Sequence, residues 1–115
     1  MIRMLAITDE YMREMLRTLR PYTVVLLRRT QRRDEPGADA VVWEHGRRNF
    51  ELRRNGQMSI VFQVEKDESD VARICIFSTS VEEARRIMEG DPAVKAGIFV
   101  YDVHLVYSFP GDSLP

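Results

Sequence analysis

The sequence has very little cysteine, because Cys75 is the only one among its 115 residues. A single cysteine cannot form an internal disulfide, so the fold must be stabilised by its packed core. Small secreted domains commonly depend on disulfides, and we therefore expect this protein in the reducing cytoplasm. Cys75 itself is predicted to be a small core residue.

Long apolar runs are also absent. No stretch approaches the roughly 18 apolar residues of a membrane-spanning helix. The apolar run at the N-terminus is interrupted by Asp9, Glu10, Arg13 and Glu14 before it reaches the length of a signal-peptide core. We expect no membrane partner and no secretion signal.

An excess of one charge is missing as well, since 17 Lys and Arg residues face 18 Asp and Glu residues and the net charge is −1. No nucleic-acid partner is expected from this balance. The arginines are concentrated in residues 1–54, but acidic residues are interleaved among them. This pattern favours solvated faces, with a polyanion-binding patch as the alternative.

Common catalytic motifs are lacking too. The sequence contains no serine-elbow, phosphate-loop or dinucleotide-binding motif. Its 2 histidines and one cysteine are too few and too far apart for the three or four converging ligands of a zinc site. We therefore expect neither a metal nor a cofactor.

What is present suits one α+β domain, with 44% hydrophobic and 30% charged residues. The first predicted helix, residues 8–19, begins with Thr8 as its cap and has an apolar stripe at helical spacing, formed by Met12, Met15, Leu16 and Leu19. A β-branched strand follows at 22–29, then a charged loop at 30–39 and a helix at 40–55 that stops before Gly56.

The second half continues with strands at 58–64 and 71–77, joined by a polar turn. The sequence Ser80-Val81-Glu82-Glu83 is a capping box that starts another helix, and Gly90-Asp91-Pro92 ends it before a last strand at 98–109. Without the first helix, the order is βαββαβ, which predicts the ferredoxin-like fold with strand order 4-1-3-2. The predicted parts are a helical extension (1–21), the ferredoxin-like domain (22–109) and a tail (110–115).

Helices in this plan cover one face of the sheet, yet the strands carry apolar residues on both faces. The uncovered face needs a partner, and we expect a homodimer or a higher homo-oligomer. The helix at 8–19 is expected to pack on this assembly.

Topology also suggests where a site lies. In the split βαβ plan, the end of the first strand, the loop at 30–39, the start of the following helix and the segment around Asp91 meet at one end of the sheet. His45 and Asp91 are therefore expected to lie close together and to line a pocket whose other walls come from residues 22–40 and the start of the last strand. The alternatives are an Asp-Pro turn in which Asp91 bonds its own backbone, and a partly buried helix histidine without a functional role.

Several of these residues resemble those of a known family. His45 stands eleven residues before Gly56, with Phe50 and Leu52 between them, and Asp91-Pro-Ala-Val-Lys-Ala-Gly97 follows the second helix of the domain. Together with the strand YTVVLL, these residues make the chain similar to the YCII-related (YciI-like) family over about residues 22–107. The chain departs from the family at Phe62-Gln63, where a Gly-Pro is common, and in the helix at 8–19.

The resemblance implies a dimeric α+β barrel and an active site built on His45 and Asp91. An imidazole oriented by a carboxylate is a good proton shuttle near neutral pH. Arg28, Arg29 and Trp43 are further candidates for contact with a substrate, against ordinary surface charge for the arginines and a core or interface role for Trp43. The predicted function is a cofactor-independent lyase or isomerase acting on a small cyclic or aromatic metabolite. The alternative is a noncatalytic dimeric module that binds a small ligand or a protein.

Overall fold

The computed structural model describes residues 6–115. Residues 22–106 form one compact unit, and residues 6–21 with 107–115 form another. The larger unit carries the candidate site. No helix of the described residues is long and apolar enough to cross a membrane.

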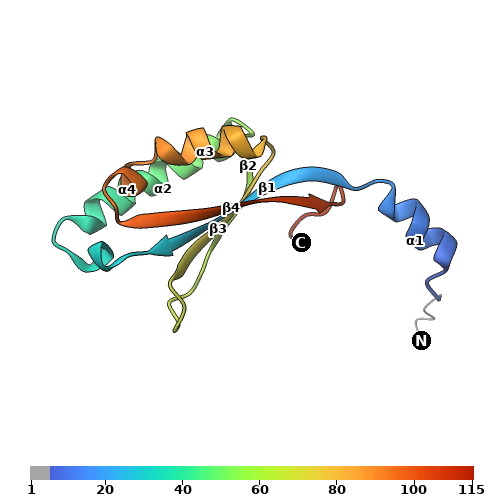
Figure 1. Ribbon diagram of the computed structural model, residues 1–115, viewed down its shortest axis with the longest axis horizontal. Coiled ribbons are helices and arrows are strands. Elements are labelled where there is room, and N and C mark those ends of the chain that lie inside the picture. Colours follow the sequence, from blue (N-terminus) through green and yellow to red (C-terminus); the bar gives the residue numbers. More distant parts are fainter. Residues whose placement is uncertain (1–5) are drawn as a thin grey trace. The chain divides into compact units, whose positions relative to one another are not determined.

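The centre of the fold is a four-stranded sheet in the order β2-β3-β1-β4. Its strands are β1 (Arg20–Arg29), β2 (Met58–Gln63), β3 (Val71–Phe77) and β4 (Phe99–Ser108). β3 pairs antiparallel with both β1 and β2, and Figure 1 shows β4 running opposite to β1. This order, taken from the other edge, is the predicted 4-1-3-2, so the α+β ferredoxin-like fold is confirmed.

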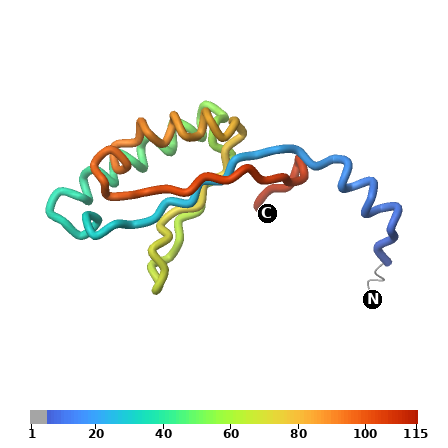
Figure 2. The backbone as a smooth tube through the Cα atoms, in the orientation of Figure 1, coloured from blue at the N-terminus to red at the C-terminus, as the bar shows by residue number. Residues whose placement is uncertain are grey.

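Two long helices, α2 (Ala38–Arg54) and α3 (Val81–Glu89), lie on the same face of the sheet (Figures 1 and 2). The predicted capping box is present, since the Ser80 hydroxyl accepts from the backbone N–H of Glu83. After its last residue, Arg54, α2 is capped by Asn55 and followed by Gly56, whose φ of 79° favours glycine.

Three local predictions were incomplete or wrong. The first helix, α1 (Asp9–Leu16), begins after Thr8 as predicted but stops before Leu19, and none of its residues is buried. The segment 30–39 is not all loop, because it contains the short helix η1 (Gln31–Asp34) and the start of α2. A further short helix, α4 (Pro92–Lys95), follows α3.

The core lies between the sheet and the helices. Its largest apolar members include Val25, Leu27, Phe77 and Phe99, each at most 2% exposed. Cys75 is 1% exposed, as predicted, and burial raises its pKa to about 12, so it remains a thiol at neutral pH.

The opposite face of the sheet is also apolar. The register places residues of β2, β3 and β1 in two cross-strand rows, Ile60–Ile76–Val24 and Phe62–Ile74–Leu26. These six side chains, the apolar band, are half-buried or exposed in the single chain. A homodimer through this face stays a prediction.

Candidate active site

His45 and Asp91 form a buried pair. His45 lies on α2, and Asp91 is the residue that begins α4. The His45 Nδ1 lies 2.7 Å from the Asp91 Oδ1, and each side chain is 1% exposed. The predicted proximity of residues 46 positions apart is therefore confirmed.

Asp91 uses its two carboxylate oxygens for different partners. Its Oδ1 faces His45, while its Oδ2 accepts from the backbone N–H groups of Ala93 and Val94, at 2.9 and 3.2 Å. The two predicted alternatives, a histidine partner and a local Asp-Pro turn, are thus both present. Asp91 also lies at the N-terminus of α4, where its negative charge is favourable, and not only after the C-terminus of α3.

The surroundings keep Asp91 ionised. Burial alone would raise the pKa of Asp91, but the hydrogen bond from His45 and those from the two backbone amides together lower it below its ordinary value. Arg48 adds a positive charge, with its Nη1 3.9 Å from the Asp91 Oδ1. An ionised Asp91 can only accept, so the Nδ1 of His45 carries a proton and donates it.

The other ring nitrogen of His45 faces a neutral group. The Asn49 Nδ2 lies 3.2 Å from the His45 Nε2. With the Asn49 amide donating, Nε2 is an acceptor and the imidazole is neutral. The ring is also packed edge-on against Phe99, with the centroids 5.2 Å apart. The pair is therefore held in the tautomer that a general base needs, with a lone pair on Nε2.

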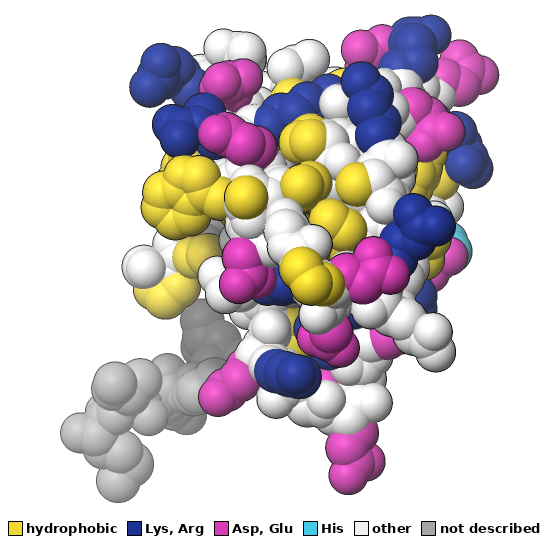
Figure 3. Space-filling model, turned by 90° about the vertical axis from the view of Figure 1, so that its left-hand side faces the viewer, with side chains coloured by type: hydrophobic (Ala, Val, Ile, Leu, Met, Phe, Trp, Pro, Cys, Tyr) yellow, Lys and Arg dark blue, Asp and Glu magenta, His cyan; other side chains and the backbone are white. Residues whose placement is uncertain are grey.

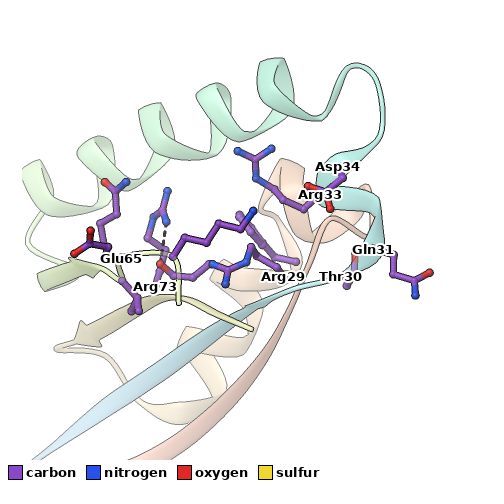
Figure 4. Close-up of a pocket in the computed structure, with 12 residues that line it drawn as sticks. Arg29, Thr30, Gln31, Arg33, Asp34, Glu65 and Arg73 are labelled. Atoms are coloured by element: carbon purple, nitrogen blue, oxygen red, sulfur yellow. Dashed lines mark hydrogen bonds between the residues drawn. The ribbon is translucent and has the colours of Figure 1, made fainter. Parts of the chain in front are cut away.

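A cavity of about 660 Å³ (Figure 4) shares Phe99 with this pair, because Phe99 both lines the cavity and packs against the His45 ring. Its walls come from the end of β1, η1, the turn after β2, β3 and the start of β4. The walls predicted from residues 22–40 and the last strand are present. However, His45 and Asp91 are not among the lining residues, so the prediction that they face this cavity is wrong. Phe99, which is 2% exposed, is the lining residue that contacts the His45 ring.

The predicted substrate-contact residues lie in different places. Arg28 is on the opposite face of β1, where Asp70 and Asp102 accept from its guanidinium at 2.8 and 2.7 Å. Arg29 lines the cavity. Trp43 is 71% exposed and lines an adjoining cavity of about 710 Å³. The structure thus brings Arg29 and Trp43 toward the candidate site and leaves Arg28 outside it.

Three further residues were missed by the sequence analysis. Asn49 contacts the Nε2 of His45, Phe99 contacts the His45 ring and lines the cavity, and Arg73 lines both cavities. Arg73 did carry a signal, since it is a lone charge inside an otherwise apolar strand. Within residues 6–115, no group of three or more His, Cys, Asp or Glu side chains is placed to hold a metal ion.

Comparisons with known proteins assign no family to this chain. No family model matches the chain, and no curated protein sequence matches it. Among solved structures, it is similar to the complex of 5-chloro-2-hydroxyhydroquinone dehydrochlorinase (TftG) from Burkholderia phenoliruptrix AC1100 with 2,5-dihydroxybenzoquinone. The TM-score is 0.49 and the identity 16%, over 72% of this chain and 90% of that one. At these values no activity is transferred from that enzyme to this chain.

Proposed function

We propose that this protein is a cofactor-independent enzyme of lyase or isomerase type that moves protons on a small cyclic or aromatic metabolite. His45 acts as the acid and base, and Asp91 orients it. The observation that carries the proposal is the buried pair at 2.7 Å, in which an ionised Asp91 fixes the proton on Nδ1. Nε2 then has the lone pair with which to accept a proton from a C–H made acidic by a neighbouring carbonyl.

The reaction needs a path from the cavity to Nε2. Phe99 lines the cavity and packs against the His45 ring, so rotation of its side chain would join the two spaces. Asn49 holds Nε2 through one hydrogen bond of 3.2 Å, which a substrate can replace. The same Nε2 would return the proton to a leaving group or to another carbon, giving elimination or isomerisation.

The proposal includes a homodimer formed through the apolar band. Its six side chains continue across three strands, and within residues 22–106 they have no helix on their side of the sheet. Two copies packed face to face would bury both bands and form the dimeric α+β barrel of the YCII-related family.

A second candidate function is a noncatalytic module that binds a small ligand. It is favoured by the burial of His45, whose two ring nitrogens both have partners inside the protein. In that case the pair ties α2 to the start of α4 and contributes stability only. Removal of the imidazole would abolish turnover in the enzyme, whereas in the binding module it would lower only the stability.

Proton exchange distinguishes them without a known substrate. Wild-type protein is incubated in D2O with hydroxylated aromatic acids and unsaturated lactones, and loss of C–H signals is followed by ¹H NMR. We expect His45→Gln to abolish exchange in a folded protein, and the matched variant of the exposed second histidine, His104→Gln, to retain it. Exchange that persists in His45→Gln, or no exchange by wild type with any compound, favours the binding module.

A further inference from the structure

The ion pairs of this protein follow a pattern. On the exposed surface, Arg28, Arg47 and Arg86 each have a carboxylate partner. Figure 3 likewise shows Lys and Arg side chains among Asp and Glu side chains on one face of the molecule. Within residues 6–115, Arg29 and Arg73 are different, because neither is in an ion pair and both are half-buried on the cavity wall.

Arg73 lies at the centre of this arrangement. It is on the inner strand β3, paired with Leu27 on one side and Gln63 on the other. Its Nη1 donates to the carbonyl of Ala72 at 2.9 Å. Burial lowers the pKa of Arg73, and the nearby charges of Arg33 and Arg29 add to that effect. The guanidinium therefore lies near two other positive charges, and within residues 6–115 it forms no ion pair.

Arg29 and Arg33 point into the same space between α2 and the sheet (Figure 4). Arg29 donates to the carbonyls of Val71 and Ser69, at 3.3 and 2.6 Å, so its charge too is not neutralised. Arg33 pairs with Asp39, whose side chain is 94% exposed. Two carboxylates, Asp34 and Glu65, do line the cavity with these arginines and Lys66, but both belong to exposed residues.

Part of the remaining wall is apolar or aromatic. Ala72 and Phe99 line the first cavity. The adjoining cavity shares Arg33 and Arg73 with it and adds Trp43 and Phe50, which are 71% and 69% exposed. A ligand that spans the two cavities would thus meet guanidinium groups at their junction and aromatic rings beyond.

We propose that these adjoining cavities bind a small cyclic or aromatic carboxylate, with its anionic group on Arg73 and Arg29 and its ring against the aromatic walls. Guanidinium groups bind carboxylates through paired, charge-assisted hydrogen bonds, and an anion would supply the compensation that the two arginines lack. The proposal rests on the proposed function, for which it names the substrate class.

Benzoate, its neutral isostere benzamide, and inorganic phosphate are suitable probes. Each is titrated into the protein while the arginine side-chain N–H signals are followed by NMR. We expect benzoate to bind at least about tenfold more tightly than benzamide, because only benzoate accepts charge-assisted bonds. It should also bind more tightly than phosphate, which has no ring to place on the aromatic walls.

Variants locate the site. Arg73→Gln and Arg29→Gln should each weaken benzoate binding at least about tenfold, and Arg73→Lys, which keeps the charge without the planar fork, should fall between. Arg28→Gln is the matched control, since it removes the same charge from the next residue on the other face of β1. Equal binding of benzamide, equal binding of phosphate, or unchanged affinity in both glutamine variants would overturn the proposal. The titration requires no proton transfer, so it can succeed where the exchange experiment fails, and the reverse.

Discussion

Replacing Asp91 tests the central feature of the site, because this carboxylate joins α2 to α4. Asp91→Ala removes two hydrogen bonds to the amides of α4 and one to His45. Loss of a helix cap costs about 1 kcal/mol, and loss of a charge-assisted hydrogen bond costs about 1.5–3 kcal/mol. The variant also leaves Arg48 without its nearest carboxylate. We expect the free energy of unfolding to fall by about 3–5 kcal/mol, as for other broken buried pairs.

Asp91→Asn is the informative companion, since asparagine is an equally good cap. Its carbonyl oxygen can accept from the amides of Ala93 and Val94, which turns its NH2 group toward the Nδ1 of His45. Nδ1 must then be an acceptor, so the imidazole proton moves to Nε2. This variant exchanges one charge-assisted bond for a neutral one, and we expect a loss of about 1–2 kcal/mol.

Two measurements test these expectations for Asp91→Ala and Asp91→Asn. Urea denaturation gives the free energy of unfolding for wild type and both variants, and the imidazole ¹⁵N chemical shifts give the tautomer of His45. The expected results are a larger loss in Asp91→Ala than in Asp91→Asn, and a change from the Nδ1–H to the Nε2–H tautomer in Asp91→Asn. An unchanged tautomer, or a loss below about 1 kcal/mol in Asp91→Ala, would show that the buried bonds do not have the assigned strengths.

Three further outcomes are expected. Folding lowers the pKa of Asp91, so ionised Asp91 stabilises the folded protein at pH values above the ordinary pKa of 3.8, and this stabilisation is lost as pH falls. The difference in free energy of unfolding between wild type and Asp91→Asn, measured by urea denaturation, should therefore shrink below that pH. Phe99→Leu should destabilise the core and raise carbethoxylation of His45 by diethyl pyrocarbonate, detected by mass spectrometry; unchanged labelling would contradict the role of Phe99 as the separating ring. Sedimentation equilibrium should give a dimer, and Leu26→Glu should give monomers; a wild-type monomer of 13.4 kDa at micromolar concentration would refute the face-to-face packing.

The parts of the fold that could be predicted are those with local causes. Ser80 caps α3 through a bond to a residue three positions away, and Gly56 follows α2 with a φ that favours glycine. The order of elements then restricts the topology to few choices. The contact between His45 and Asp91 followed from that topology, because the N-terminal half of α2, which carries His45, and the segment after α3, which carries Asp91, meet at one end of the sheet.

The parts that could not be predicted depend on packing between distant segments. α4 has only four residues and is stabilised by the Asp91 cap, so the sequence contains no apolar periodicity that would predict it. The register of β1 and β3 shifts between Leu27 and Arg28, so the positions opposite them in β3 cannot be assigned by simple alternation. In the sequence Phe99 is an ordinary strand residue, and its contact with both a cavity and the His45 imidazole depends on α2 as well as β4.

The position of Phe99 connects the two proposals. His45 is 1% exposed, so the proposed proton transfer would need a state in which its Nε2 is open to the cavity, and movement of Phe99 would provide that state. A ligand can favour that state only if it binds the open form more tightly than the closed one. The arginines are available in both states, because Arg29 and Arg73 line the cavity even with Phe99 in place. Differential binding must therefore come from the ring of a ligand that lies on the Phe99 side of the arginines and takes the space that Phe99 leaves. A carboxylate without a ring should occupy the arginines and leave His45 buried, whereas a cyclic carboxylate should expose it.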